Sequence, residues 1–395
     1  MKTIELKKDI YWVGVIDWNI RNFHGHTYTT KRGTTYNAYL ILDEKIALVD
    51  TVMGIFAPEM IEKIKEITPL EKIDYIIANH VETDHSGALP GILKFCPKAK
   101  VLGTLKCKEG LWRNFYIDMD FQVVKTGDVL NLGKRSLRFI EAPMIHWPDS
   151  MFTYCPEEEL LLPNDAFGQH YATSERFDDE VEQSELMEEA KKYYANILWP
   201  LSQVILKKIK EVQKSNISIK MIAPSHGIIW RKDPLKIINA YLSWAKNDTQ
   251  RKIVIVYETM WGATENMARE IAEGIISEGV SVKLFDSTQV DRTDVVSEML
   301  DAKGFIFGSS THDNDMLPTL AGFLTFLRGL KPKNRIASVF GSYGWAGGAV
   351  KEIENLLKET GIGLVQPSLE IKYLPNQEEL KKCFEFGKNF TKSLT

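Results

Sequence analysis

The feature that most constrains the fold is an alternation of apolar runs and amphipathic segments after residue 252. Ile253–Val256 is continuously apolar, as in parallel strands that are buried on both faces. The next segment places Met267, Ile271 and Ile275 on one helical face. Strands that alternate with crossover helices predict a doubly wound parallel sheet. Further strand-like and helical runs are Val282–Phe285, Phe305–Phe307, Ile336–Phe340, Leu320–Leu327 and Ala349–Leu357.

The preceding part of the chain has a different pattern, in which strands and helices are mixed. Helical periodicity covers Ala57–Ile67 and a long stretch from about Ser184 to Val212. The apolar pattern then stops for seven polar residues, Lys246–Lys252, so we expect two domains, 1–250 and 251–395. The strand-like runs of the first domain are Tyr11–Ile16, Thr35–Leu42, Lys45–Val49, Ile73–Ala78, Val101–Gly103, Ser136–Ile140 and Lys220–Ala223.

Composition excludes several classes of protein. Of the 395 residues, 44% are hydrophobic and 26% charged, which is typical of globular proteins and not of disordered ones. A net charge of −4 gives no basic footprint for nucleic acid. No window approaches the roughly 18 apolar residues of a membrane span, and Met1–Asp9 lacks the apolar core of a signal peptide. We therefore expect a cytoplasmic protein with neither nucleic-acid nor membrane partners.

The four cysteines exclude one kind of cofactor. Cys96, Cys107, Cys155 and Cys383 form no Cys-x-x-Cys pair. The chain thus lacks the motif of a rubredoxin-type iron centre, a zinc ribbon or an iron–sulfur cluster. If the protein is a redox enzyme, its electron donor is a separate molecule.

A cluster of metal-ligand residue types follows several strand-like runs. The run Ile73–Ala78 leads directly into His80, Glu82 and Asp84, which alternate and would point the same way along an extended chain. His146, Asp165 and His226 follow later runs at similar exits. Three imidazoles and three carboxylates are enough for two metal ions. A nitrogen and oxygen set without thiolate fits non-haem iron, manganese or zinc.

Three loops of the second domain are suited to a flavin. They follow strand-like runs, and ligands of open α/β sheets bind at the carboxyl ends of strands. Small and hydroxyl residues before a helix offer N–H groups to a phosphate, and aromatic residues between glycines offer flat faces to a ring. No Gly-x-x-x-x-Gly-Lys or Gly-x-Gly-x-x-Gly motif is present to indicate another nucleotide. The predicted contacts are Thr259, Met260, Trp261, Gly262, Ala263 and Thr264, then Thr311, His312, Asp313 and Asn314, then Ser342, Tyr343, Gly344, Trp345, Ala346 and Gly347.

These motifs carry a family resemblance. The string from His80 to His85 resembles the His-x-His-x-Asp-His motif of the metallo-β-lactamase superfamily, most of whose members are di-zinc hydrolases, with Glu82 at the second histidine. An oxygen ligand there favours iron over zinc. That departure is the signature of flavodiiron proteins, which the chain resembles over essentially its whole length. The resemblance implies a metallo-β-lactamase-like αββα sandwich followed by a flavodoxin-like domain that binds FMN.

The resemblance also implies roles for single residues. His80, Glu82 and His146 would hold one iron, Asp84 and His226 the other, and Asp165 would bridge them. His85 matches a zinc ligand of the hydrolases but often stays off the metal in flavodiiron proteins, so both roles stay open for it, with a place beside the ligands favoured. His24 and Tyr193 would line the diiron pocket and hydrogen-bond bound oxygen species.

The two cofactors together predict the reaction. FMN delivers two electrons and two ferrous ions two more, and four electrons reduce O₂ to water while two couple two NO molecules into N₂O. We expect an oxidoreductase that reduces O₂, NO or both, supplied by an external donor such as rubredoxin, a reduced deazaflavin or a flavin reductase. The resemblance implies a head-to-tail homodimer or a dimer of dimers, with FMN of one subunit beside the irons of the other.

The residues leave two alternative functions open. A di-zinc hydrolase fused to a flavodoxin would contain zinc and cleave esters or thioesters anaerobically. A pure electron carrier, whose first domain is only a scaffold, would keep all activity after Asp165→Asn.

Overall fold

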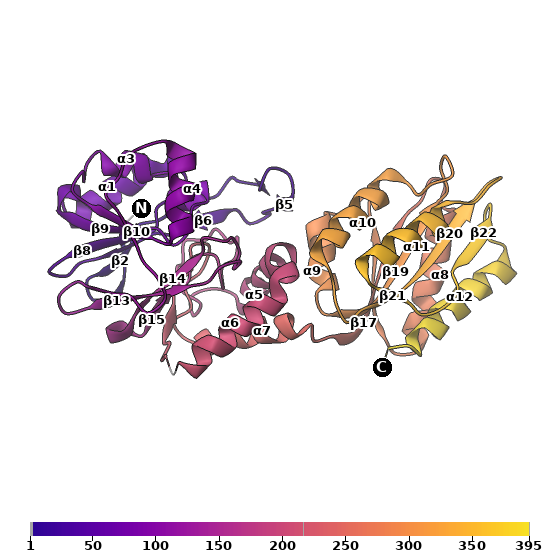
Figure 1. Cartoon of the computed structure of the whole chain (residues 1–395). Coiled ribbons are helices and arrows are strands. Elements are labelled where there is room, and N and C mark those ends of the chain that lie inside the picture. Colours follow the sequence, from indigo (N-terminus) through magenta and orange to yellow (C-terminus); the bar gives the residue numbers. More distant parts are fainter. Residues whose placement is uncertain (1–2, 216, 395) are drawn as a thin grey trace. The chain divides into compact units, whose positions relative to one another are not determined.

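The computed structural model describes residues 3–215 and 217–394, which form two compact units (Figure 1). The first unit comprises Met1–Tyr193 and Gln203–Leu242, and the second comprises Tyr194–Ser202 and Ser243–Thr395. Residue 250 begins β17 (Gln250–Glu258) in the second unit. As a domain boundary, residue 250 stays a prediction.

Two facing sheets form the centre of the first unit. The first has the strand order β1 (Ile4–Lys7), β2 (Ile10–Trp12), β7 (Tyr39–Ile41), β8 (Ile46–Val49), β9 (Ile73–Ile77), β10 (Lys100–Gly103), β11 (Phe121–Val123). The second has the order β12 (Val129–Asn131), β13 (Ser136–Glu141), β14 (Met151–Cys155), β15 (Leu160–Leu162), β16 (Met221–Ile222). Two short pairs join β3 (Val15–Asp17) to β6 (Thr34–Tyr36) and β4 (Asn22–Phe23) to β5 (Tyr28–Thr29).

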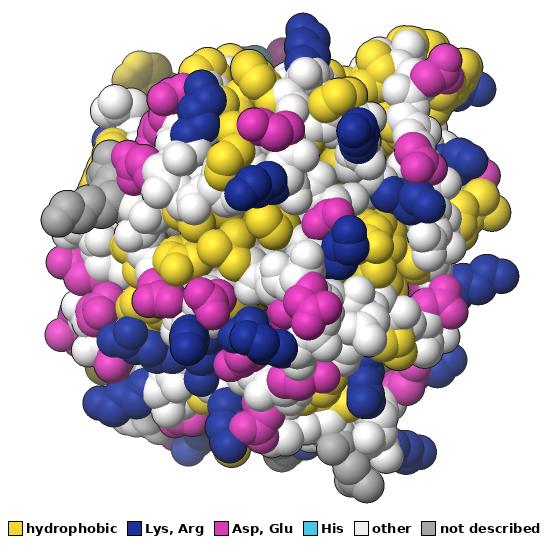
Figure 2. Space-filling view, turned by 90° about the vertical axis from the view of Figure 1, so that its left-hand side faces the viewer, with side chains coloured by type: hydrophobic (Ala, Val, Ile, Leu, Met, Phe, Trp, Pro, Cys, Tyr) yellow, Lys and Arg dark blue, Asp and Glu magenta, His cyan; other side chains and the backbone are white. Residues whose placement is uncertain are grey.

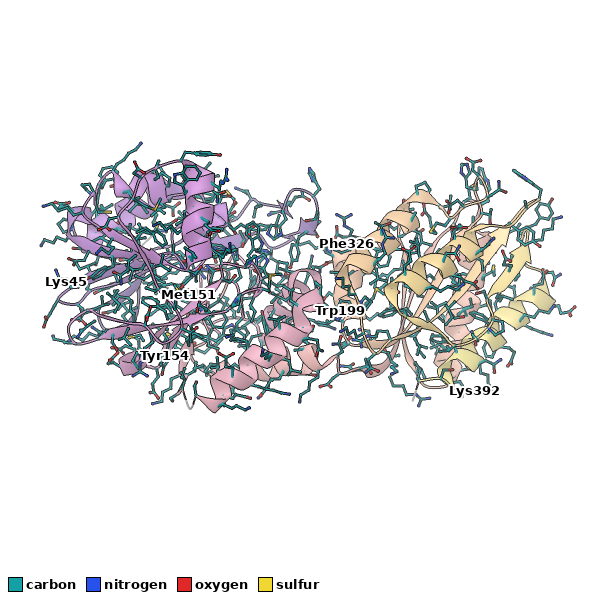
Figure 3. All side chains as sticks on the ribbon, viewed as in Figure 1. Lys45, Met151, Tyr154, Trp199, Phe326 and Lys392 are labelled. Atoms are coloured by element: carbon teal, nitrogen blue, oxygen red, sulfur yellow. The ribbon has the colours of Figure 1, made fainter. Side chains whose placement is uncertain are left out.

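The core of this unit lies between the two sheets. Val49 and Ile77 of one sheet and Phe139 and Met151 of the other belong to one cluster of buried side chains. Met151 and Tyr154 both lie on β14 (Figure 3), and all five residues of this strand are buried because helices cover the outer face of its sheet. The result is an αββα sandwich (Figure 1), which confirms the fold that the family resemblance implies. Its helices are α1 (Ala57–Ile67), α2 (Thr83–Ser86), α3 (Leu89–Leu93), α4 (Leu105–Phe115), α5 (Gln183–Tyr193), α6 (Ser202–Lys214) and α7 (Pro234–Lys246), with short turns η1 (Gly54–Phe56), η2 (Leu70–Lys72) and η3 (Pro156–Glu158).

The prediction of one long helix from about Ser184 to Val212 is wrong. The helix α5 ends at Tyr193, and a π-helical turn η4 (Tyr194–Leu198) and a 3₁₀ turn η5 (Trp199–Leu201) precede α6. Pro200 lies in η5, and proline cannot donate the backbone hydrogen bond that a continuous helix needs.

The second unit is a doubly wound parallel sheet. Its order is β18 (Ser281–Asp286), β17, β19 (Ala302–Ser310), β20 (Ile336–Tyr343), β21 (Gly363–Leu364), and β22 (Leu369–Lys372) also pairs with β20. This 2-1-3-4-5 order is that of flavodoxin-like folds. Helices α8 (Ala263–Ser277) and α12 (Gln377–Thr391) pack together, as do α10 (Pro318–Leu330) and α11 (Ala349–Thr360), while α9 (Arg292–Met299) packs on β19.

The surface agrees with the balanced composition. Figure 2 shows Lys and Arg side chains intermixed with Asp and Glu over the face that it presents. Among the described residues, no helix is both long and apolar enough to cross a membrane.

Helices α8 and α12 approach closely at two glycines. A Cβ atom on Gly274 would overlap the carbonyl oxygen of Phe384, and one on Gly387 would overlap that of Ile271. Only glycine permits this spacing.

We expect Gly274→Ala to lower the free energy of unfolding by about 1–3 kcal/mol, because an added methyl group forces the helices apart. The control is Gly322→Ala in α10, where a Cβ would meet nothing within 4 Å. It should raise stability by about 0.5–1 kcal/mol, since alanine favours helix. Urea denaturation of both variants measures the difference, and equal stabilities would contradict the close packing.

Candidate metal and flavin sites

The predicted metal ligands lie on loops that follow strands of both sheets. His80 follows β9, His146 follows β13, Asp165 follows β15 and His226 follows β16. The expectation that His80, Glu82 and Asp84 alternate along an extended chain is wrong. Helix α2 begins at Thr83 directly after Glu82, and this turn brings His85 to the cluster beside Asp84.

Four side chains form a first set of donor atoms: His80, Glu82, His146 and Asp165. The Nε2 atom of His80 lies 3.4 Å from Glu82 Oε2 and 3.7 Å from Asp165 Oδ2. His146 Nε2 lies 3.5 Å from the same two oxygens. Ligand atoms bound about 2.1 Å from one ion lie roughly 3.0–3.4 Å apart. The four distances here, 3.4–3.7 Å, reach from the upper end of that range to slightly above it, so a small contraction of this set would surround a cation.

A second set lies beside the first and consists of Asp84, His85 and His226. The Nε2 atoms of His226 and His85 lie 3.1 and 3.3 Å from Asp84 Oδ2. They also lie 3.5 and 3.1 Å from Oδ1 of Asp165. Asp165 therefore turns one oxygen to each set, which is the arrangement of a carboxylate between two cations.

Burial and charge indicate that this cluster is built for cations. Among the described residues, His80 Nε2, both carboxylate oxygens of Asp84 and Asp165 Oδ2 are buried without a hydrogen-bond partner. Burial opposes ionisation of Asp165, but the imidazoles of His85 and His146 hold the pKa of this carboxyl well below its usual range. In the same way, burial opposes charging of His85, and Asp84 and Asp165 raise its pKa to about 9. Buried oxygen and nitrogen donors without partners fit two metal ions.

Further buried residues orient the ligands. Asp149 Oδ2 accepts hydrogen bonds from His80 Nδ1 at 2.9 Å and from the amide of Val81 at 2.8 Å. The carbonyl of Thr35 accepts from His226 Nδ1 at 2.6 Å. Such bonds fix which imidazole nitrogen faces the metal.

Asp50 ties two ligand-bearing loops together. Its carboxylate accepts hydrogen bonds from the backbone and side-chain amides of Asn79 and from the side chain of Asn164. These asparagines immediately precede His80 and Asp165. Our sequence analysis missed Asp50 and Asp149, although Asp50 follows a strand-like run as the ligands do.

The structure brings His24 and Tyr193 to the cluster. His24 Nε2 lies 3.1 Å from Glu82 Oε1, and its side chain is about one-third exposed. The hydroxyl of Tyr193 donates to Asp165 Oδ1 at 3.1 Å. Burial, followed by the charge of Asp165, raises the pKa of Tyr193 well above its usual value, so this hydroxyl stays protonated. Trp147 packs edge-on against His80, with ring centroids 5.1 Å apart.

The second unit has a pocket of about 900 Å³ at the carboxyl ends of its strands. Most of the predicted flavin contacts line it, together with Ser310, Tyr373 and Leu374, which our sequence analysis did not select. Thr259, Gly262, Thr264 and Gly347 do not line it, but Thr259 Oγ1 accepts a hydrogen bond from the amide of Gly262. Trp261 and Trp345 are 87% and 91% exposed, so their faces are available to a planar ring.

Three hydroxyl groups meet at the start of α8, in the second unit. Thr264 Oγ1 lies 2.9 Å from Ser310 Oγ and 2.8 Å from Ser342 Oγ. Backbone N–H groups of a helix N-terminus beside hydroxyl donors form an anion site, which fits a phosphate. Pocket size, hydroxyl cluster and exposed indoles together fit FMN.

Fold and sites thus define a flavoprotein with a two-metal centre on a β-lactamase-like sandwich. Comparisons with known proteins agree. The flavodoxin family model matches residues 255–387, and the ODP family beta lactamase model matches residues 34–227. A nitric oxide reductase from Moorella thermoacetica is 53% identical over 387 residues, which cover 98% of this chain and 97% of that relative.

Solved structures share the whole architecture. Rubredoxin oxygen:oxidoreductase from the anaerobe Desulfovibrio gigas has a TM-score of 0.97 at 36% identity, covering 100% of this chain and 98% of its own. The flavodiiron protein from Giardia intestinalis has a TM-score of 0.96 at 36% identity, covering 100% and 97%. The chain belongs to the flavodiiron protein family. Its cofactors are therefore FMN and a diiron centre, and these relatives do not support the hydrolase alternative.

We expect Asp149→Ala to lower iron affinity by about 10- to 100-fold, because His80 loses the acceptor that orients its ring. Iron titration of the metal-free protein measures the affinity. The control is Asp120→Ala, which removes a carboxylate that is 65% exposed and should leave the affinity unchanged. Equal affinities in the two variants would contradict the orienting role of Asp149.

Proposed function

We propose that this flavodiiron protein reduces O₂ to water, NO to N₂O, or both, with electrons from a separate donor molecule. The observation that carries the proposal is Asp165, whose two oxygens face two sets of donors in a chain that also has a flavin pocket. Two metals and one flavin match the electron demand of either reduction. The names of the relatives, a nitric oxide reductase and a rubredoxin oxygen:oxidoreductase, support the same two substrates.

The ligand roles are part of this proposal. His80, Glu82 and His146 would hold one iron, Asp84 and His226 the other, and Asp165 both. We now add His85 to the second set, because its Nε2 is closer to Asp165 than that of His226 is, 3.1 against 3.5 Å. The bound irons supply electrons and open coordination positions to the substrate.

His24 and Tyr193 would act on the substrate side of this centre. The hydroxyl of Tyr193 stays protonated and can donate a hydrogen bond to a substrate oxygen atom. His24 is partly exposed and lies against Glu82, so its imidazole can carry a proton from solvent into the pocket. Reduction of O₂ to water and coupling of NO both consume protons, which makes such a residue useful for either substrate.

The electron donor would be a rubredoxin, a reduced deazaflavin or a flavin reductase, since the chain has no Cys-x-x-Cys pair. We also propose a head-to-tail homodimer, alone or as a dimer of dimers, in the cytoplasm. Two indoles that are nearly fully exposed at the mouth of the flavin pocket support an interface there, because exposed apolar patches mark binding surfaces.

We expect Asp165→Asn to abolish reduction of both gases and to keep the FMN absorbance, because one neutral amide replaces the shared carboxylate. The protein is reduced anaerobically, O₂ or NO is then added in separate experiments, and gas consumption and N₂O are measured. The control is Asp301→Asn in the second unit, where the carboxylate pairs with Lys252. Gas consumption at the wild-type rate by Asp165→Asn would refute the diiron assignment, and the wild-type ratio of the two rates identifies the preferred substrate.

Mixed subunits test the dimer. The double variant Thr264→Val/Ser342→Ala removes two hydroxyls of the proposed phosphate site and should lose FMN, while Asp165→Asn loses the metal activity. If FMN of one subunit serves the irons of the other, unfolding and refolding an equal mixture should restore part of the activity that each variant lacks. A mixture as inactive as its components would contradict the head-to-tail arrangement.

A further inference from the structure

An apolar cavity of about 150 Å³ lies in the first unit, between the second sheet and the helices α6 and α7. Phe152 of β14 and Leu161 of β15 form its sheet side, and Ile209 and Ile238 line its helix side. Its volume is about five times the ~30 Å³ that one water molecule occupies in the liquid. Side chains in protein interiors normally leave few voids of that size, because each void costs contacts and stability.

The inner wall of the cavity consists of neighbours of the metal ligands. Ile145 precedes His146, and Ala166 follows Asp165, and both line the cavity while being only 4% and 2% exposed. Phe167 is also part of this wall, and its amide donates to the hydroxyl of Tyr241 at 2.8 Å. The inner wall of the cavity is therefore formed by residues that adjoin two of the proposed diiron ligands in the chain.

The outer end is nearer to solvent. Leu235, at the start of α7, is 60% exposed and lines the cavity, as does the exposed Gln213 near the end of α6. Exposure thus falls along the cavity from these helix ends toward Ile145 and Ala166. The cavity therefore has exposed lining residues at the helix ends and buried lining residues at the ligand loops.

The lining selects what can occupy the cavity. Lys208 is one of its few polar residues, and its Nζ is paired with Glu211 Oε2 at 3.0 Å. A stable internal water needs two to four polar partners, whereas dry apolar cavities bind xenon and other apolar guests. By contrast, the partly exposed side chains of His24 and Glu82 beside the metal cluster are polar.

We propose that this cavity binds small apolar diatomic gases and supplies them to the diiron centre through the wall of Ile145 and Ala166. The inference rests on the proposed function, since O₂ and NO are such gases. Both partition from water into apolar surroundings, so the cavity raises their local concentration beside the ligands. Passage requires a transient displacement of the Ile145 side chain, since the neighbouring Ala166 has only a methyl group.

Xenon NMR of the holoprotein in solution tests the binding step. Xenon should bind the wild-type protein, and Ile209→Trp should remove this binding by filling the cavity. The matched control is Val204→Trp, which adds the same ring on α6 at a residue that is 38% exposed and does not line the cavity. The cavity is not a gas site if the wild-type protein binds no xenon. The same holds if Ile209→Trp binds xenon as the wild-type protein does.

Kinetics test the supply step on the same variants. We expect Ile209→Trp to lower kcat/KM for O₂ and NO by roughly five-fold, with kcat at saturating gas, flavin reduction and iron content unchanged. Ile238→Phe, a smaller change, should give a smaller decrease, and Val204→Trp none. A variant that excludes xenon but keeps the wild-type kcat/KM overturns the supply role. A wild-type protein that reduces neither gas would instead refute the proposed function, while xenon still reports on the cavity.

Discussion

The pairing of the buried Asp165 carboxylate with imidazoles on both sides is the interaction on which the first unit depends. Its Oδ1 and Oδ2 atoms face different donor sets, so every ligand loop must end within a few ångströms of one side chain. The two facing sheets make this possible, because strands of both sheets end at one edge. Their packed core fixes the strand ends, and Asp50 holds two of the loops in register. The rigid sandwich thus gathers carboxylates and imidazoles around one buried side chain, and together they form a set of oxygen and nitrogen donors suited to cations.

Much of this could be predicted from residue types at strand ends. The runs before His80, Asp165 and His226 are apolar and short, and loops after such runs gather at one edge of a sheet. The orienting residues were harder to find, because Asp149 lies in a turn with no apolar run of its own before it. Which carboxylate reaches which imidazole depends on packing between sheets, and no spacing along the chain encodes it. The turn of α2, which carries His85 to the cluster, is equally invisible in a pattern of alternating residues.

The flavin-binding unit was easier to predict from the sequence, because its fold repeats a local unit of strand, loop and helix. Each of the three predicted loops follows one such strand, so their meeting at the pocket needs only the parallel order of the sheet. The sequence analysis missed Tyr373 and Leu374 as lining residues of the flavin pocket, because they follow β22, a short and partly exposed strand with a weak apolar pattern. The single helix from about Ser184 to Val212 was mispredicted because helical periodicity takes no account of the helix break at Pro200.

The close crossing of α8 and α12 has a consequence for biosynthesis. All strands of the flavodoxin-like sheet leave the ribosome before α12 does, and until then the face of α8 around Gly274 lacks its cover. Nascent chains fold as units, so the second unit closes in one late step when α12 docks. The metallo-β-lactamase-like unit is complete in the chain long before that point. In newly made molecules the iron-binding half can therefore be ordered while the face of α8 that α12 covers is still exposed.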